Sequence, residues 1–495
     1  MMAKNVLWIM TDQHRADCLG FMGHPVAQTP HLDRLAAEGV VFERAFCQSP
    51  VCMASRAALM TGRYPAAVRV RGMGVLPPQE TTLPEWLRRN GYSTGAFGKV
   101  HLTPEQYTRD QLGSRVPVLD WRQFAGPAHL APIADDPYKT DYGFQVHVGC
   151  DDAGQGHFKA WLRREAPHLA DLRPEPWSPD GPGDLVVSPY PSEFHPTTYV
   201  ASQAEQFIRS QSGDAPWLAF CSFIHPHHPF SPPADQIARY DGADIPLPER
   251  KGGVEARLIP PLPATAIGEI DRYSTGLQRR IVLHYLATIS LIDDGVGRLV
   301  QALRDTGRMD DTVILFVADH GEFLGNHGLL RKPSLHYDET LRAPMLLRCP
   351  GLERRRVDGL VELVDLYPTL LGLLGIETNA GVQGIDWSAE LRDGRDVGRD
   401  EIHSDMYDLA PVVFGKTHGA YAACQTLRTH HWKLNVFPDD GPQYGMLFHL
   451  AEDPDESRNL YDDPGCAAVR EELLWRLVSR LHKQVDPLPL RLTQY

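Results

Sequence analysis

The chain has 495 residues and a formal net charge of −14 at pH 7, with 49 lysines and arginines against 63 aspartates and glutamates. A chain of this length can bury one large hydrophobic core or two smaller ones. Its 42% of hydrophobic residues is typical of a globular protein. The acidic balance excludes general binding to nucleic acid or to an anionic membrane. An anionic substrate would therefore need a local positive pocket.

The N-terminal apolar run, Val6 to Met10, is shorter than the hydrophobic region of a secretory signal, and no later run approaches a membrane span. We therefore expect a cytoplasmic protein without a membrane partner. Eight cysteines in a chain of this length, with no Cys-x-x-Cys pair, favour neither a disulfide framework nor a structural zinc site. All of them except Cys52 are expected to be ordinary core or surface thiols.

The chain opens with the pattern of a strand, a helix and a second strand. Val6 to Met10 is continuously apolar, as expected for a central strand that is buried on both faces. A helix is predicted from Pro30, with Thr29 as its N-cap and Gly39 at its end. Val40 to Phe46 is predicted to be the next strand.

Two further helices bear on function and on fold. One is predicted to begin near Cys52 and to end at Gly62. Cys52 would then lie at a helix N-terminus, where backbone N–H groups favour an anion. The other is long, because apolar residues repeat at helical spacing from Val282 to Leu303 before Gly307 closes the pattern.

Three more apolar runs each end in a cluster of polar residues: Tyr92 to Phe97, Trp217 to Ile224, and Thr312 to Ala318. Strands that alternate with helices predict an α/β fold with a mainly parallel central sheet flanked by helices. Such sheets bind ligands beyond the carboxyl ends of their strands. The polar clusters that follow these runs and the first strand should therefore meet at one edge of the sheet.

The residues that follow the Val6 to Met10 run and the Thr312 to Ala318 run would suit a divalent cation. Asp12, Gln13, Asp319 and His320 offer two carboxylates, an amide oxygen and an imidazole, a set without thiolate. The alternative is that Asp12 caps a helix and that Asp319 and His320 form a polar strand end. Both interpretations stay open at this point.

Cationic and proton-transferring side chains occur in the same clusters, namely Lys99, His101, His227 and Lys332. They are the groups that a site needs to stabilise a multiply charged oxyanion and to protonate a leaving oxygen. Each one alone is more simply a surface lysine or a packed histidine. Their joint occurrence after predicted strands favours a functional site.

Several motifs resemble those of one family. Cys52 to Arg56 resembles the sulfatase signature Cys-x-Pro-x-Arg, with Ala54 in place of the proline. Gly98 to Leu102 resembles the Gly-Lys-Trp-His-Leu element of the same family. Further resemblances lie in Val6 to Asp12, Thr29 to Ala36, Pro226 to Pro229, Ala318 to Lys332 (with Asn326 replacing an aspartate), Leu363 to Leu371, and Leu447 to Tyr461. The chain is therefore similar over most of its length to the sulfatase family of the alkaline phosphatase superfamily, close to its arylsulfatase and phosphonate monoester hydrolase branch.

This resemblance implies one divalent metal ion, Ca²⁺ or Mn²⁺, and a formylglycine made from Cys52 by a maturation enzyme. The metal ligands would be Asp12, Gln13, the modified Cys52, Asp319 and His320. Gln13 departs from the Asp-Asp pair of many calcium sulfatases and resembles the phosphonate monoester hydrolases and some promiscuous arylsulfatases.

The resemblance also implies roles for the remaining candidates. Arg56 would neutralise and position the formylglycine diol, and Lys99 and Lys332 would bind the non-bridging oxygens of the ester. His227 would bind or protonate the leaving side, with Lys332 as the alternative proton donor. His101 would deprotonate the second hydroxyl of the diol.

The implied activity is metal-dependent hydrolysis of a small anionic ester, with sulfate monoesters preferred. Cleavage of phosphonate monoesters or phosphodiesters with the same nucleophile is the first alternative. A phosphatase or phosphomutase of the superfamily is a further one, although these enzymes usually have serine or threonine as nucleophile. A non-enzymatic metal-binding scaffold remains if Ala54 prevents maturation.

The predicted organisation is a catalytic α/β domain over residues 1–376 and a smaller C-terminal α+β region over residues 377–495. Within the latter, Ala420 to Leu427 and Trp432 to Phe437 are predicted strands. An amphipathic helix is predicted from Arg470 to Val485, with Leu473, Leu474, Leu477 and Leu481 facing inward.

Two segments give weaker signals. The apolar, proline-rich tail, Pro487 to Tyr495, is expected to pack on a neighbouring subunit of a dimer or tetramer. Thr103 to Pro196 has no clear periodicity, and we expect it to contribute loops that set substrate specificity.

Overall fold

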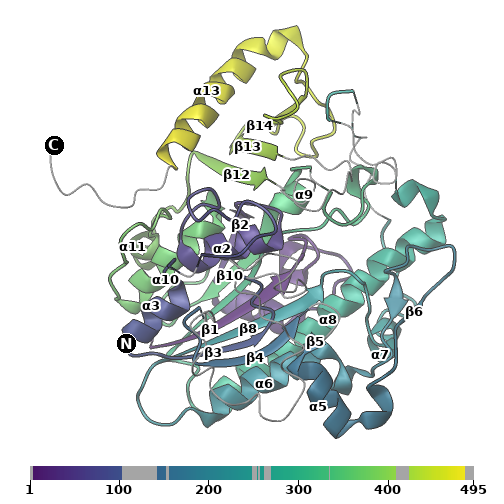
Figure 1. Cartoon of the computed structure of the whole chain (residues 1–495), viewed down its shortest axis with the longest axis vertical. Helices are drawn as coiled ribbons and strands as arrows, with labels where there is room; N and C mark the ends of the chain where they lie inside the picture. Colours follow the sequence, from purple (N-terminus) through teal and green to yellow (C-terminus); the bar gives the residue numbers. More distant parts are fainter. Residues whose placement is uncertain are drawn as a thin grey trace, which may run out of the picture.

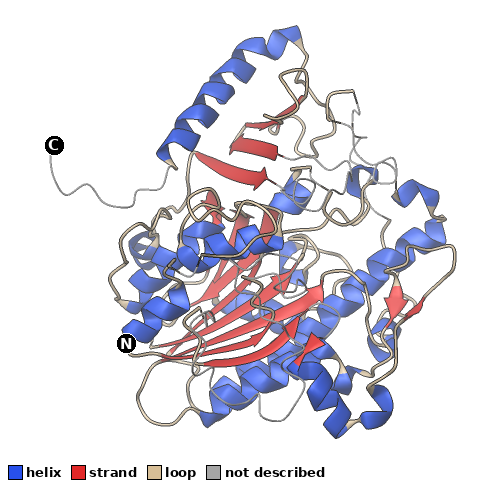
Figure 2. Cartoon of the chain, in the orientation of Figure 1, coloured by secondary structure: helices blue, strands red, loops and turns tan. Residues whose placement is uncertain are grey.

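The computed structural model describes residues 4–77, 79–102, 142–151, 155–247, 254, 257–260, 269–333, 335–407 and 423–484. A nine-stranded sheet forms the middle of the molecule, with helices on both faces (Figures 1 and 2). Its order is β11-β2-β10-β9-β1-β8-β3-β4-β5. The strands are β1 (Asn5–Asp12), β2 (Val40–Phe46), β3 (Ser93–Gly98), β4 (Val146–Asp151), β5 (Gln155–Gly156), β8 (Trp217–Pro226), β9 (Thr312–Ala318), β10 (Arg342–Arg348) and β11 (Arg355–Glu362).

The sheet is mainly parallel, as predicted. Strand β1 lies parallel to β8 on one side and to β9 on the other, and β3 continues the parallel set beyond β8. Strand β10 runs antiparallel between β9 and β2, and β11 is parallel to β2. The carboxyl ends of β1, β3, β8 and β9 therefore lie along one edge.

Strand β1 shows why the central strands are continuously apolar. Val6, Trp8 and Met10 belong to the core on one face of the sheet, whereas Leu7 and Ile9 belong to the core on the other. Side chains alternate between the two faces of a strand, so both sets must be apolar when both faces are covered.

The helices divide between these two cores. Helices α2 (Cys52–Thr61), α3 (Leu83–Arg89), α10 (Leu366–Leu374) and α11 (Ser388–Asp393) cover one face. The other face is covered by α1 (Pro30–Glu38), α5 (His157–Glu165), α6 (Pro196–Ser210), α7 (Ala234–Ala238) and α8 (Thr275–Asp305). The predicted helices α1, α2 and α8 are confirmed.

The C-terminal region is α+β, as predicted. Its sheet is antiparallel and consists of β12 (Glu401–Tyr407), β13 (Ala423–Thr429), β14 (Trp432–Val436) and β15 (Gly445–His449). Helix α13 (Ala467–Lys483) packs on it at one end of the molecule (Figure 1). The short helix α9 (Asp338–Leu341) precedes β10. The boundary at residue 376 stays a prediction, and the tail from residue 485 lies outside the described residues.

One orientation predicted for α13 is wrong. Leu473 and Leu477 are buried and Leu481 packs partly against the same core, but the Leu474 residue is 42% exposed. A helix turns about 100° per residue, so Leu473 and Leu474 cannot both face the sheet squarely.

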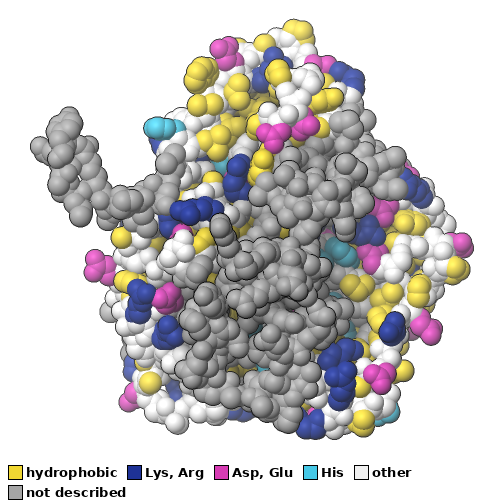
Figure 3. Space-filling model, viewed as in Figure 1, with side chains coloured by type: hydrophobic (Ala, Val, Ile, Leu, Met, Phe, Trp, Pro, Cys, Tyr) yellow, Lys and Arg dark blue, Asp and Glu magenta, His cyan; other side chains and the backbone are white. Residues whose placement is uncertain are grey.

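Within the region that lacked periodicity, the described part contains β4, β5, α5 and the two-stranded pair β6 (Glu175–Pro176) and β7 (Val186–Val187). On the face seen in Figure 3, acidic and basic side chains of the described residues are interspersed rather than gathered by sign.

No helix in the described part of the chain has both the length and the apolar content of a membrane span. The cytoplasmic location stays a prediction.

Candidate active site

Helix α2 places Cys52 at its first position, as predicted from the sequence. Val51 is the extended residue before the helix, and Gly62 ends it in the left-handed conformation with a φ of 65°. The Cys52 residue is 4% exposed and belongs to the core on that face of the sheet. The helix therefore presents this residue from within the protein and not on its surface.

Arg56, one turn further along α2, joins the ends of β1, β3 and β9 and also contacts β8. Its Nε donates to Asp319 Oδ2 at 2.8 Å and its Nη2 to Asp12 Oδ2 at 3.2 Å. Its Nη1 donates to the carbonyl of Lys99 at 2.6 Å and to Ser222 Oγ at 3.0 Å. The structure thus brings together the polar clusters that were predicted to meet at one edge of the sheet.

The Arg56 guanidinium is fully buried between two carboxylates. Burial lowers its pKa, but the charges of Asp319 and Asp12 outweigh this and raise the pKa above its ordinary value. Arg56 is therefore a permanent cation that holds two predicted metal ligands in place.

Asp12 is held as a carboxylate by several cations. Burial raises its pKa, but the positive charges of Lys99, Lys332 and Arg56 hold the pKa well below the ordinary value. Lys99 Nζ is the nearest of the lysine groups, at 3.0 Å from Asp12 Oδ2. Asp12 is therefore charged at neutral pH.

Three acceptor atoms at the strand ends fit a cation. Asp12 Oδ1 and Gln13 Oε1 lie on fully buried side chains, and neither has a hydrogen-bond partner among the described residues. His320 Nδ1 lies 2.9 Å from the Gly321 carbonyl and donates to it, which leaves Nε2 as an acceptor. Nε2 is 3.7 Å from Asp12 Oδ1 and also 3.7 Å from Asp319 Oδ1. Buried acceptors that lack donors, such as Asp12 Oδ1 and Gln13 Oε1, are costly, and a divalent cation would satisfy both. His320 Nε2 would exchange its contact with Lys332 for the cation.

The orientation of the Gln13 amide is fixed by its neighbours. Its Nε2 donates to Glu322 Oε2 and lies 3.3 Å from His228 Nδ1. Only the amide nitrogen can donate to a carboxylate, so Oε1 is the atom turned away from Glu322. Gln13 also has a φ of 58°, a conformation that is costly outside glycine and is found at functional sites.

Lys99 lies between two carboxylates. Besides Asp12, its Nζ is 3.7 Å from Oδ1 of Asp151, the last residue of β4. Neither Asp151 nor Glu322 was named as a candidate from the sequence. Asp151 lies in the region without periodicity, and Glu322 appeared only as part of a motif, although its position four residues after the end of β9 was a usable signal.

Cys52 and His101 form a coupled pair. Burial raises the pKa of the Cys52 thiol, but the charge of Lys332, followed by the charge and a hydrogen bond of His101, takes the pKa well below its ordinary value. Burial and Lys99 lower the pKa of His101, but Cys52 and Asp151 raise it above the ordinary value on balance. The two side chains are therefore electrostatically coupled, and each shifts the pKa of the other towards its charged form.

Lys332 and His227 complete the set of predicted residues. Lys332 Nζ donates to His320 Nε2 at 2.8 Å. His227 Nδ1 donates to the His228 carbonyl at 2.6 Å, and the two histidine rings stack with centroids 4.1 Å apart. Burial holds the pKa of His227 well below its ordinary value, so this ring is neutral with Nε2 as an acceptor. All ten predicted site residues thus occupy one region, and their roles stay predictions.

The family follows from comparison with known proteins. A family model described as Sulfatase matches residues 4–376 of the chain. The chain belongs to the sulfatase family. A second model, described as N-sulphoglucosamine sulphohydrolase, C-terminal, matches residues 325–484 of this sulfatase-family protein.

Relatives within the superfamily carry different names. An arylsulfatase of Clostridium perfringens is 29% identical, covering 93% of this sulfatase-family chain and 90% of its own. The multifunctional alkaline phosphatase superfamily protein PehA of Trinickia caryophylli is 30% identical, covering 96% of each. Among solved structures, the phosphonate monoester hydrolase of Agrobacterium radiobacter is similar with a TM-score of 0.78 and 26% identity, covering 99% of this chain and 98% of its own. These likenesses confirm the fold and the branch, and they leave the substrate open.

Proposed function

We propose that the protein hydrolyses sulfate monoesters with a formylglycine nucleophile derived from Cys52. The observation that carries this proposal is the position of Cys52, at the start of a buried helix and close to Lys332, His101 and His320. The Gly98 to Leu102 element, which resembles that of sulfatases, supplies both Lys99 and His101. This constellation suits attack on an anionic tetrahedral centre.

One divalent cation would be held by Asp12, Gln13, Asp319 and His320, together with an oxygen of the modified Cys52. The oxygen-rich set suits Ca²⁺, and the imidazole nitrogen makes Mn²⁺ equally suitable, so both ions remain candidates. When bound, the cation would neutralise negative charge on the ester and help to orient it.

The modified Cys52 would supply a hydroxyl nucleophile that attacks the sulfur atom. Arg56 acts on it through charge, because its hydrogen bonds go to Asp12, Asp319, Ser222 and the Lys99 carbonyl. Lys99 and Lys332 would bind the non-bridging oxygens of the ester. His101, next to Cys52, would accept the proton of the second hydroxyl as the aldehyde re-forms and sulfate leaves the covalent intermediate.

The neutral form of His227 refines the proton transfer to the leaving oxygen. With Nδ1 donating to a backbone carbonyl, Nε2 can accept a hydrogen bond but has no proton to give. A lysine offers up to three donor hydrogens, and Lys332 lies close enough to His227 to act on the pKa of that ring. We therefore assign protonation of the leaving group to Lys332 and binding to His227.

Two observations favour phosphonate monoesters as a second substrate class. Gln13 replaces a carboxylate that many calcium sulfatases have, and the phosphonate monoester hydrolase of Agrobacterium radiobacter has a similar fold with a TM-score of 0.78. Sulfate and phosphonate monoesters both present a tetrahedral monoanion, so the same cations would bind both.

Mass spectrometry of the peptide that carries Cys52, followed by kinetics on matched aryl esters, tests these proposals. We expect formylglycine at position 52 and a higher kcat/KM on the aryl sulfate than on the aryl phosphonate monoester. The reverse order of rates would favour the second substrate class. An intact thiol in fully active protein would refute the formylglycine mechanism.

The proposed partners are the ester and a formylglycine-generating enzyme. All ten residues of α2 are buried in the folded chain. A second enzyme could not reach Cys52 there, so modification would have to occur before α2 packs. A homo-oligomer is proposed from the apolar tail alone.

A further inference from the structure

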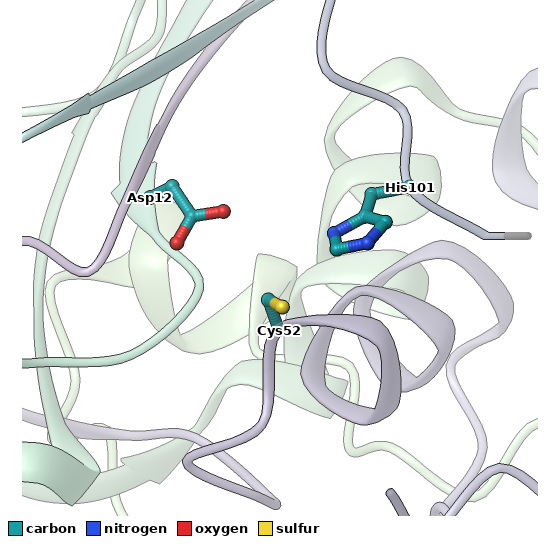
Figure 4. A group of neighbouring side chains, drawn as sticks. All are labelled: Asp12, Cys52 and His101. Atoms are coloured by element: carbon teal, nitrogen blue, oxygen red, sulfur yellow. The ribbon is translucent and has the colours of Figure 1, made fainter. Parts of the chain in front are cut away.

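The thiol form of the chain brings three metal-ligating atoms together at Cys52. An Asp12 carboxylate oxygen, Cys52 Sγ and a ring nitrogen of His101 all lie within 4.8 Å of one another. Figure 4 shows the three side chains converging from β1, from the start of α2 and from the segment after β3. All three residues are buried, with exposures of 0% for Asp12, 4% for Cys52 and 3% for His101.

Two of these side chains each have a buried atom that makes no hydrogen bond. Asp12 Oδ1 and His101 Nδ1 have no hydrogen-bond partner within the described ranges of the chain. The cations on Asp12 occupy its other oxygen, because both Lys99 and Arg56 contact Oδ2. A ligand that accepts electron pairs would therefore meet acceptors that are already buried and unpaired.

A thiolate, an imidazole and a carboxylate form a donor set for zinc. Zn²⁺ sites with three protein ligands keep a fourth position for water, with bonds of about 2.3 Å to sulfur and about 2.0 Å to nitrogen or oxygen. Tetrahedral ligands at those bond lengths lie roughly 3.3–3.6 Å apart, so side-chain shifts of about 1 Å would close the site. Thiolate also selects zinc over the hard ions Ca²⁺ and Mn²⁺.

We propose that a folded chain whose Cys52 has remained a thiol binds one thiophilic divalent cation, Zn²⁺, through Asp12, Cys52 and His101. A chain that carries formylglycine lacks the one soft ligand and with it this site. Unmodified and modified chains thus differ in metal preference, soft in the first and hard in the second. Asp12 serves both sites, so the two ions exclude each other.

Cobalt binding to the full-length thiol protein tests the proposal directly. Protein made without a maturation enzyme, with the thiol verified by intact mass, is titrated with Co²⁺ and then with Zn²⁺. We expect one Co²⁺ per chain, an absorption band from thiolate-to-cobalt charge transfer, and displacement by Zn²⁺. Cys52→Ser should abolish the band.

Two histidine variants separate this site from the proposed Ca²⁺ or Mn²⁺ site. His101→Gln should weaken Co²⁺ and Zn²⁺ binding at least tenfold, since it removes a ligand of the thiolate site. His320→Gln is the comparison variant, because among the described residues His320 groups with Asp12 and Asp319 and not with the Asp12, Cys52 and His101 set. It should retain the band and most of the affinity.

Alkylation gives a second readout that needs no variant. Zn²⁺, but not Ca²⁺ at the same concentration, should slow the reaction of Cys52 with iodoacetamide, measured by peptide mass spectrometry. Absence of the charge-transfer band, equal losses in the two histidine variants, or an alkylation rate unchanged by Zn²⁺ would each overturn the proposal. None of these results depends on ester hydrolysis, so the proposed function is tested separately.

Discussion

At the scale of single residues, Arg56 contacts more parts of the site than its position in the Cys52 to Arg56 motif indicates. It neutralises two buried carboxylates and also fixes the backbone after β3. Lysine keeps the positive charge but offers neither the planar fork nor the reach for four acceptors. The geometry of the guanidinium, and not its charge alone, therefore sets the relative positions of Asp12 and Asp319.

Arg56→Lys should lower both stability and activity. Leaving buried carboxylates under-paired should reduce the free energy of unfolding by about 3–5 kcal/mol. Displacement of Asp12 or Asp319 by about 1 Å should lower kcat/KM by about 10²-fold. Arg476→Lys is the control, because Arg476 pairs with Glu401 and its side chain is 37% exposed. Equal urea midpoints for the two variants would contradict this account.

Glu322 decides which atom Gln13 presents to the cation. In Glu322→Gln the new amide can donate to Gln13 Oε1, so the Gln13 amide can turn and place Nε2 at the cation site. We expect the affinity for Ca²⁺ or Mn²⁺, measured by calorimetry, to fall about 10–100-fold. Glu205→Gln, which alters a surface carboxylate paired with Arg298, should leave the affinity unchanged. Unaltered affinity in Glu322→Gln would show that the amide orientation is fixed by other contacts.

At the scale of elements, α8 caps α1 through one buried carboxylate. Asp293 accepts hydrogen bonds from the backbone N–H groups of His31 and Leu32 at the start of α1. Burial nevertheless raises the pKa of Asp293 from 3.8 to about 7. The folded protein therefore binds a proton here more tightly than the unfolded chain does.

Asp293 should make stability depend on pH in a defined direction. Because its folded pKa is the higher one, the free energy of unfolding should fall as pH rises from about 4 to about 7, by at most about 4 kcal/mol. In Asp293→Asn this component is missing. Urea unfolding of both proteins at pH 4.5 and pH 7 measures the difference, and parallel slopes would refute it.

Helix α13 offers a comparison of two neighbouring leucines. Leu477 is 1% exposed and packs on the C-terminal sheet, whereas Leu474 is 42% exposed. Leu477→Ala should lower the free energy of unfolding by about 2–4 kcal/mol, and Leu474→Ala by less than about 1 kcal/mol. Equal losses in denaturant titrations would mean that α13 is rotated from this orientation.

At the scale of the whole molecule, the tail bears on assembly. Trp475 and Val478 of α13 are 66% and 46% exposed, and the chain continues from this helix into an apolar segment. Exposed apolar surface of this kind marks contact sites. Deletion of residues 485–495 should lower the mass measured by sedimentation equilibrium. An unchanged mass would refute the proposed oligomer contact.

The sequence predicted the fold because buried parallel strands leave long apolar runs that end in polar residues. Asp12 and Asp319 were found in this way, since β1 and β9 contain the continuous apolar runs Val6 to Met10 and Val313 to Ala318. Strand β4 alternates polar and apolar residues, so Asp151 at its end gave no such signal. The contact between Glu322 and Gln13 depends on a left-handed backbone turn that no local pattern predicts. The error at Leu474 arose because adjacent leucines fit the same apolar stripe, and only tertiary packing decides between them.

The packing of α2 against α10 has a consequence for the timing of biosynthesis. Helix α10 ends at Leu374, so the core that α2 shares with α10 is completed only after that residue has been made. At translation rates of about 5–20 residues per second, roughly 15–65 s separate the synthesis of Cys52 from that of Leu374. During this interval α2 cannot yet pack against a complete α10. The order of elements along the chain therefore limits the time in which an enzyme can modify Cys52 before α2 packs.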